Sequence, residues 1–225
     1  MKNIDWRNPA VTAAAAAALL IVAGPGYWFY SESRKEAQRE TVAQIVGEVT
    51  QAVGLAISMR GAEGEATQLD AMVAEAEQRI AALRGAPAKP EPDVFEAAEQ
   101  YAVDSQRAMR RQAEVVRTRF RTAASQNALM AHMAQSGNRS SEWISEAVAK
   151  RRKLEQDYFD FRAAAAAYSS ALDAMPATRR QLVQIGLPAP LYDEAALGRV
   201  QTLAADDARA ATEGLESLKR LPPPR

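Results

Sequence analysis

The chain has 225 residues, no cysteine, and 28 Lys and Arg residues balanced by 28 Asp and Glu residues. The absence of cysteine excludes disulfide frameworks, zinc–thiolate sites and thiol catalysis. A formal net charge of zero gives no overall attraction toward nucleic acid or anionic lipid.

An uncharged stretch near the N-terminus dominates the organisation of the chain. No Asp, Glu, Lys, Arg or His falls between Arg7 and Glu32. A helix over residues 9–30 would be roughly 33 Å long, enough to cross a hydrocarbon core of about 30 Å. We therefore predict a short tail over residues 1–8 and a transmembrane anchor helix over 9–30 that contacts membrane lipid. Aromatic residues at its two ends are typical of a membrane interface: Trp6, Tyr27, Trp28 and Tyr30.

Alternatives stay open for this stretch. A basic start followed by apolar residues 10–23 also fits a cleaved secretory signal, although the residues around the cleavage point match poorly. Proline in Gly24-Pro25-Gly26 predicts a kink or break, because its ring clashes with the carbonyl four residues earlier. Basic residues are nearly as frequent on one side as on the other, and a short tail favours a signal anchor. We accordingly predict a single-pass protein of the inner (cytoplasmic) membrane, with its helical domain on the periplasmic or extracytoplasmic side.

Residues 31–85 are predicted to form helices next to the membrane. Their apolar residues recur in steps of three and four, the spacing of a coiled-coil seam. Gly61 and Gly64 are predicted to interrupt the seam only softly, since a glycine costs a helix about 1 kcal/mol relative to alanine. Three prolines within residues 86–92 then predict a stiff, extended linker. The seam positions are Val42, Val46, Val49, Val53 and Ala56, followed by Leu69, Val73, Ala76, Ile80 and Leu83.

Residues 93–175 are predicted to form a long antiparallel helical hairpin. Asp93 is the expected N-cap of its first helix, with Glu96 reaching back to it. After a loop over residues 136–140, Ser140 or Ser141 caps the second helix. The stripe of the first helix consists of Phe95, Ala98, Ala102, Met109, Val116, Phe120 and Ala123. The seam of the second is the most regular in the chain, with one misfit at Arg151: Ile144, Ala147, Leu154, Tyr158, Phe161, Ala165, Tyr168, Leu172 and Met175.

Pro176 is predicted to end the second helix of the hairpin. Residues 176–192 then form a connector with a short helical turn, residues 193–221 a C-terminal helix, and residues 222–225 a Pro-rich tail. No strand is indicated, because alternating β-branched runs bounded by turn residues are missing. The predicted fold class is all-α: a single N-terminal transmembrane helix followed by an elongated antiparallel helical bundle or coiled coil.

Six arginines cluster between positions 107 and 121, opposed locally only by Glu114. One interpretation is a docking face for an acidic partner or lipid headgroups. The other, which the balanced total charge favours, is that acids on neighbouring helices pair with them. Aromatic residues are not interleaved with these arginines, so we expect no nucleic-acid binding. The candidate partner-binding residues are Arg107, Arg110, Arg111, Arg117 and Arg121.

Catalytic signals are weak. His132 is the only histidine, and one histidine cannot supply the paired ligands of a di-iron bundle, so we expect it to be structural or to face solvent near a helix end. Asp157 and Asp160 share a helix face, but a helical pair such as Lys153 with Asp157 neutralises them more simply than a cation does. No phosphate-binding loop, dinucleotide fingerprint or nucleophile elbow is present. We expect no enzymatic activity, cofactor, metal or small-molecule substrate.

The sequence therefore favours a non-catalytic, membrane-anchored helical scaffold or assembly subunit. It would bind partner proteins through an exposed helical face, or associate with itself through its coiled-coil helices. The alternative is a membrane-tethered ligand-binding or sensing bundle, in which the small side chains of residues 163–167 leave room for a guest between helices.

Overall fold

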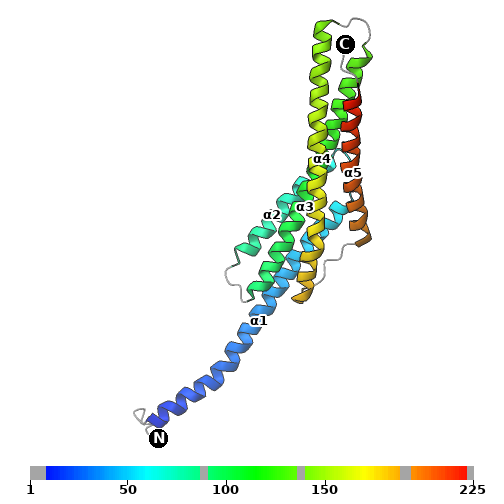
Figure 1. Cartoon of the computed structure of the whole chain (residues 1–225). Coiled ribbons are helices and arrows are strands. Elements are labelled where there is room, and N and C mark those ends of the chain that lie inside the picture. The colour runs from blue at the N-terminus through cyan, green and yellow to red at the C-terminus, as the bar shows by residue number, and fades with distance from the viewer. Residues whose placement is uncertain (1–8, 87–90, 136–139, 188–193, 222–225) are drawn as a thin grey trace.

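The computed structural model describes residues 9–86, 91–135, 140–187 and 194–221, with side chains from residue 32 onward. Over these ranges the chain is helical with short turns and contains no strand, which confirms the all-α prediction for this part. Figure 1 shows a bundle in which consecutive helices alternate in direction. The helices are α1 (Pro9–Ser58), α2 (Glu65–Arg84), α3 (Pro92–Ala134), α4 (Ser141–Gln184) and α5 (Glu194–Arg220).

Helix α3 lies at the centre of this arrangement. It packs against α1, α2 and α4, while α5 packs against α4 and touches α1. Helices α3 and α4 extend together beyond the end of α1 and α2, where only α5 accompanies them (Figure 1). The bundle therefore has a thick half built on all five helices and a thinner half built on three.

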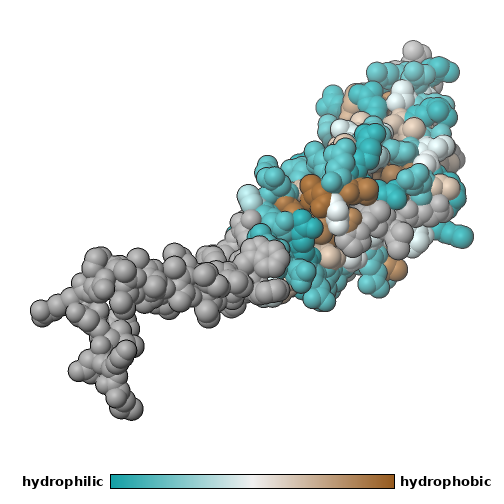
Figure 2. All heavy atoms as spheres, turned by 90° about the horizontal axis from the view of Figure 1, so that it is seen from below, coloured by the Kyte–Doolittle hydropathy of each residue, from teal (hydrophilic) through white to brown (hydrophobic). Residues whose placement is uncertain are grey.

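Apolar seams predicted from the sequence form the core. All ten seam positions between residues 42 and 83 are buried, as are seven of the nine in α4. Exceptions lie in the thinner half, where Ala123 is exposed and Phe120, Ile144 and Tyr158 are only partly buried. In the coloured part of the face that Figure 2 shows, hydrophilic residues predominate, and the largest group of hydrophobic residues lies near the middle.

The helix end predicted at Pro176 is wrong, because α4 continues to Gln184. Proline removes one backbone hydrogen bond and crowds the preceding turn. Met175 and Leu182 are fully buried on either side of it, and the Thr178 hydroxyl donates to the Met175 carbonyl at 3.1 Å. Burial of the two flanking side chains therefore holds the helix together across the proline.

Two predictions about helix ends are also wrong. Gly61 does more than soften the seam: it adopts a φ of 79°, which favours glycine, in the turn between α1 and α2. The Glu65 carboxylate accepts hydrogen bonds from the backbone N–H groups of Gly61 at 2.5 Å and Ala62 at 2.9 Å, which fixes this turn. Asp93 is not the N-cap of α3, because Pro92 already occupies the first turn, where its missing N–H costs nothing.

The predicted N-cap at Ser140 is confirmed, since its hydroxyl accepts from the backbone N–H of Trp143 at 3.2 Å. Other predicted segments lie wholly or mostly outside the described residues: the tail over 1–8 with Trp6, most of the linker over 86–92, the loop over 136–139, the connector from 188 onward and the tail over 222–225.

The backbone of the predicted anchor is helical. Helix α1 runs from Pro9 through Pro25 to Ser58 without the break predicted at the Gly-Pro-Gly triplet. The side chains of Tyr27, Trp28 and Tyr30 lie outside the described part. Among the helices for which the structure describes side chains, none is long and apolar enough to span a bilayer. The transmembrane assignment of residues 9–30 therefore stays a prediction from the sequence.

Candidate functional site

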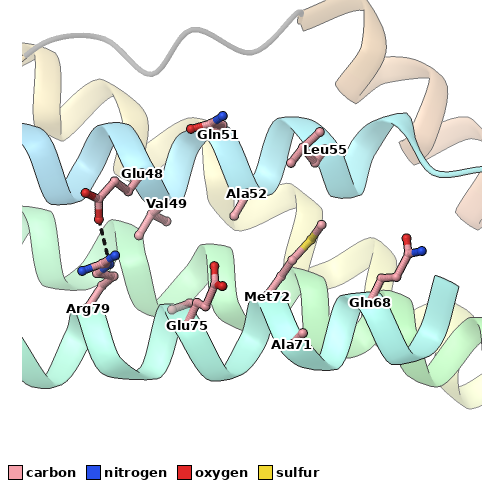
Figure 3. A pocket seen from close by; sticks show the side chains of 11 residues that line it. Glu48, Val49, Gln51, Ala52, Leu55, Gln68, Ala71, Met72, Glu75 and Arg79 are labelled. Atoms are coloured by element: carbon pink, nitrogen blue, oxygen red, sulfur yellow. Dashed lines mark ion pairs between the residues drawn. The ribbon is translucent and has the colours of Figure 1, made fainter.

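A groove between α1 and α2 is the candidate functional site. The two helices run side by side in opposite directions, and Figure 3 looks into the space between them. The groove has a volume of about 520 Å³. We call it the α1–α2 groove; it is lined by Glu48, Val49, Gln51, Ala52, Leu55, Gln68, Ala71, Met72, Glu75, Ala76 and Arg79.

The lining follows from the seam spacing. On each helix most lining residues come one position before a buried seam residue, as Leu55 precedes Ala56 and Met72 precedes Val73. One residue along an α-helix is a rotation of about 100°, so these side chains border the seam rather than lying within it. The seam closes the floor of the groove and leaves its rim in solvent.

Small and large apolar side chains meet in the middle of the α1–α2 groove. Leu55 is 51% exposed, and Met72 points toward it from α2 (Figure 3). Ala52 and Ala71 beside them fill little of the space between the helices. The exposed leucine projects from the surface, and the small alanine side chains on the two helices leave space beside it. Another helix can pack against a surface of this shape.

Charged side chains mark one end of the groove. Arg79 Nε lies 2.7 Å from the Glu48 carboxylate and joins α2 to α1 across the opening. Both side chains remain substantially exposed, at 48% and 34%. Glu75 projects from α2 toward the groove one turn further along (Figure 3). Charged side chains beside an apolar patch are common in protein-binding surfaces.

Helix α3 holds both walls of the groove in place. On the α1 side, the hydroxyls of Thr50 and Tyr101 hydrogen-bond at 3.0 Å within the core, and the Gln112 amide donates to the Ala56 carbonyl at 2.7 Å. The Gln112 bond satisfies one of the carbonyls that a helix end leaves without a partner in its own helix. The groove is therefore pre-formed on a fixed support.

On the α2 side, the predicted arginines provide much of this support. Arg110 pairs with Glu77 at 2.6 Å, and Arg117 pairs with Asp70. Both acids are on α2, so these two arginines join α2 to α3 from the outside.

The other three candidate arginines also lie in ion pairs. Arg107 pairs with Asp104 at 3.0 Å and Arg111 with Glu114 at 2.6 Å, both within α3. Arg121 reaches α4, with its guanidinium 2.9 Å from the Asp157 carboxylate. The predicted pairing with acids on neighbouring helices is therefore confirmed for Arg110, Arg117 and Arg121, whereas Arg107 and Arg111 pair within their own helix. A partner-binding role for the five residues stays a prediction. The sequence analysis did not identify the α1–α2 groove as a candidate site.

Arg119, the sixth arginine of the cluster, extends from α3 to contact both α5 and the turn between α1 and α2. Its guanidinium pairs with Asp207 of α5 and packs against Gly61 in the turn between α1 and α2. Burial raises the pKa of Asp207, and the arginine opposes that shift. Burial also raises the pKa of the nearby Tyr168 hydroxyl. Arg119 therefore joins α3 to α5 and to the α1–α2 turn.

A second polar cluster joins α3 to α4 around Asp157. Its carboxylate accepts from the Ser125 hydroxyl at 2.5 Å and from Lys153 at 2.8 Å. Burial alone would raise the pKa of Asp157, but these hydrogen bonds and the charge of Arg121 hold it below its ordinary value. The carboxylate is therefore committed to contacts within the protein, as the predicted pairing with Lys153 required.

We expect Asp157→Asn to lower the free energy of unfolding by about 1–2 kcal/mol at neutral pH, through loss of charge-assisted hydrogen bonds. A carboxylate with a depressed pKa stabilises the fold above its unfolded pKa of about 3.9, and this stabilisation disappears as the pH falls through the folded value. The gap between wild type and variant should therefore narrow below about pH 4. Urea unfolding at several pH values measures it, and a gap that stays constant would contradict the assignment.

Of the two roles predicted for His132, structural or solvent-facing, the structure favours the structural one. It is buried, its ring stacks on Trp143 with centroids 4.9 Å apart, and its Nε2 lies 3.0 Å from the Trp143 carbonyl oxygen. Within the described part of the chain no group of three or more His, Cys, Asp or Glu side chains could hold a metal ion.

The alanine-rich segment suggested as a guest site contributes directly to the core. Ala164 and Ala165 are buried among the residues of the main hydrophobic cluster, whereas Ala163 and Ala166 face solvent.

Comparison with known proteins finds no matching family model, no similar curated protein and no similar solved structure.

Proposed function

We propose that this protein is a non-catalytic helical scaffold, held at a membrane by residues 9–30, that binds a protein helix in the α1–α2 groove. The observation that carries the proposal is the exposure of Leu55. This apolar side chain is more than half exposed at the centre of the groove, next to the other apolar residues that line it. The seam residues of both helices are already buried in the core of this chain, so the groove beside the seam is the surface that remains available to a partner.

The proposed anchor rests on the sequence and on the continuity of α1. No charged residue interrupts the chain between Arg7 and Glu32, and one helix carries the backbone from Pro9 into the bundle. The first buried side chain of its described part is Val42, so α1 enters the core only in its C-terminal portion. A signal anchor of this kind places the bundle on the extracytoplasmic side of the inner membrane.

We expect the full-length chain to remain in the membrane pellet after extraction with alkaline carbonate. A variant with Leu20→Arg and Ile21→Arg should move to the supernatant, because charged residues at the centre of a span cost about 2.5–3.5 kcal/mol each. Recovery of the wild-type chain in the supernatant, or equal retention of both chains, would contradict the anchor.

Partner binding can be tested with a photo-crosslinking amino acid at position 55 of the full-length chain in intact cells. We expect a discrete protein adduct from this position. A matched chain labelled at Leu203, which is 45% exposed on α5, should give none. Absence of an adduct at position 55, or the same adducts from both positions, would overturn the groove as a binding site.

A further inference from the structure

The two walls of the α1–α2 groove carry complementary side chains at the same positions along the helix axes. We call each such position a height. Leu55 stands beside Met72 at one height, and Gln51 beside Glu75 at the next (Figure 3). At the charged end Glu48 stands beside Arg79. One surface thus contains both an apolar projection and its hollow, and charges of both signs. A surface of this kind can pack against a copy of itself.

We propose that the α1–α2 groove is occupied by the same groove of a second copy of this chain, around a twofold axis parallel to α1. In this arrangement α1 of each copy lies beside α2 of the other, and the four helices form a bundle around the axis. The inference rests on the proposed function and deepens it, because it names the partner that the groove receives.

With the axis parallel to the helices, residues at the same height meet. Glu48 lies opposite Arg79 of the second copy, so the two in-chain ion pairs close into a ring of alternating charges. Glu75 lies opposite Gln51 of the second copy, whose amide can donate to the carboxylate. Across the proposed interface, opposite charges therefore meet at the first height, a hydrogen-bond donor meets an acceptor at the second, and apolar side chains meet at the third.

The apolar height provides the contact at the centre. Leu55 meets Met72 of the second copy, a side chain flexible enough to fit around it. Ala52 and Ala71 present only methyl groups, which allows the helix backbones to approach closely. Burial of an exposed leucine next to charged and polar side chains is common at protein interfaces.

The direction of the axis agrees with the anchor. A twofold axis parallel to α1 leaves both copies of this helix pointing the same way, so both N-terminal segments enter one membrane. An axis perpendicular to α1 would send them in opposite directions. Tethering in one membrane also raises the effective concentration of each copy for the other, which favours association through a surface of modest size.

The absence of cysteine makes a direct test available, because an introduced cysteine has no competitor in the chain. Two full-length chains carrying different tags, one with Leu55→Cys and one with Met72→Cys, are co-expressed, and their membranes are oxidised. Disulfides form only when the two Cα atoms lie within about 7 Å, so only direct neighbours link. We expect at least about tenfold more mixed disulfide than from Leu55→Cys paired with Leu203→Cys.

A second measurement uses the mass of the detergent-solubilised chain. Wild type should have twice the single-chain mass, and Leu55→Asp should have the single-chain mass with an unchanged helical circular dichroism spectrum. Leu203→Asp, also an exposed leucine, should leave the doubled mass intact. A single-chain mass for wild type, or mixed disulfide no greater than in the control pair, overturns the second copy as occupant. If a photo-crosslink from position 55 then identifies a different protein, the proposed function survives while this inference fails.

Discussion

Leu172→Ala should lower the free energy of unfolding by about 2–5 kcal/mol, the largest stability effect that we expect from a single truncation. Leu172 is 1% exposed, near the C-terminal end of the α4 seam. Truncation removes the apolar contacts of the leucine and leaves a cavity, which helices held by many neighbouring contacts close only in part. Urea unfolding of the detergent-solubilised chain, followed by circular dichroism, measures the loss.

The matched control is the same substitution at a solvent-facing position. Leu203 is 45% exposed on α5, and Leu203→Ala should change the free energy of unfolding by no more than about 0.5 kcal/mol. The comparison separates burial from the general effect of exchanging leucine for alanine in a helix. Equal losses at the two positions would mean that the seam of α4 is not the packed interior described above.

Leu172 also shows why much of this fold can be predicted from the sequence. A seam that repeats every three and four residues has one physical solution in water, which is to face another helix. Val46 and Leu69 belong to such seams and are buried. The pattern does not say which helix covers which seam, and for that reason the place of α3 at the centre of the bundle could not be predicted.

Two local sequence signals predicted helix ends incorrectly. Pro176 is a strong stop signal by itself, but the fully buried Met175 and Leu182 stabilise the helix on both sides of it. Asp93 had the sequence context of an N-cap, but Pro92 starts the helix. For Pro176 the deciding contacts are tertiary and lie outside the few residues on which the prediction depended, whereas for Asp93 the deciding residue is its immediate neighbour, Pro92.

The candidate site was harder to predict for a different reason. The arginines of α3 attract attention because charge is visible in a sequence, but Arg110 and Arg117 pair with acids of α2. Leu55 looks like an ordinary neighbour of the α1 seam. Its exposure means that none of the described helices covers this side of α1, and the sequence does not contain that information in any local pattern.

Gly214 provides a second test, because here a local rule and a tertiary contact predict opposite signs. Glycine inside an exposed helix costs about 1 kcal/mol relative to alanine, so the local rule predicts that Gly214→Ala stabilises α5. A Cβ at this position, however, would overlap the ring of Tyr158 from α4. Tyr158 packs against both hydrophobic clusters and cannot turn away without losing those contacts.

We therefore expect Gly214→Ala to lower the free energy of unfolding by about 1–2 kcal/mol, since overpacking typically costs 1–3 kcal/mol and helix propensity returns part of it. Gly198, in the same helix, has nothing near its missing Cβ, and Gly198→Ala should raise stability by up to about 1 kcal/mol. Combining Gly214→Ala with Tyr158→Ala should cost less than the sum of the two single changes, because the overlap is then gone. Stabilisation by both glycine substitutions would show that α5 does not lie against Tyr158, and the three-helix half of the bundle would then need a different packing.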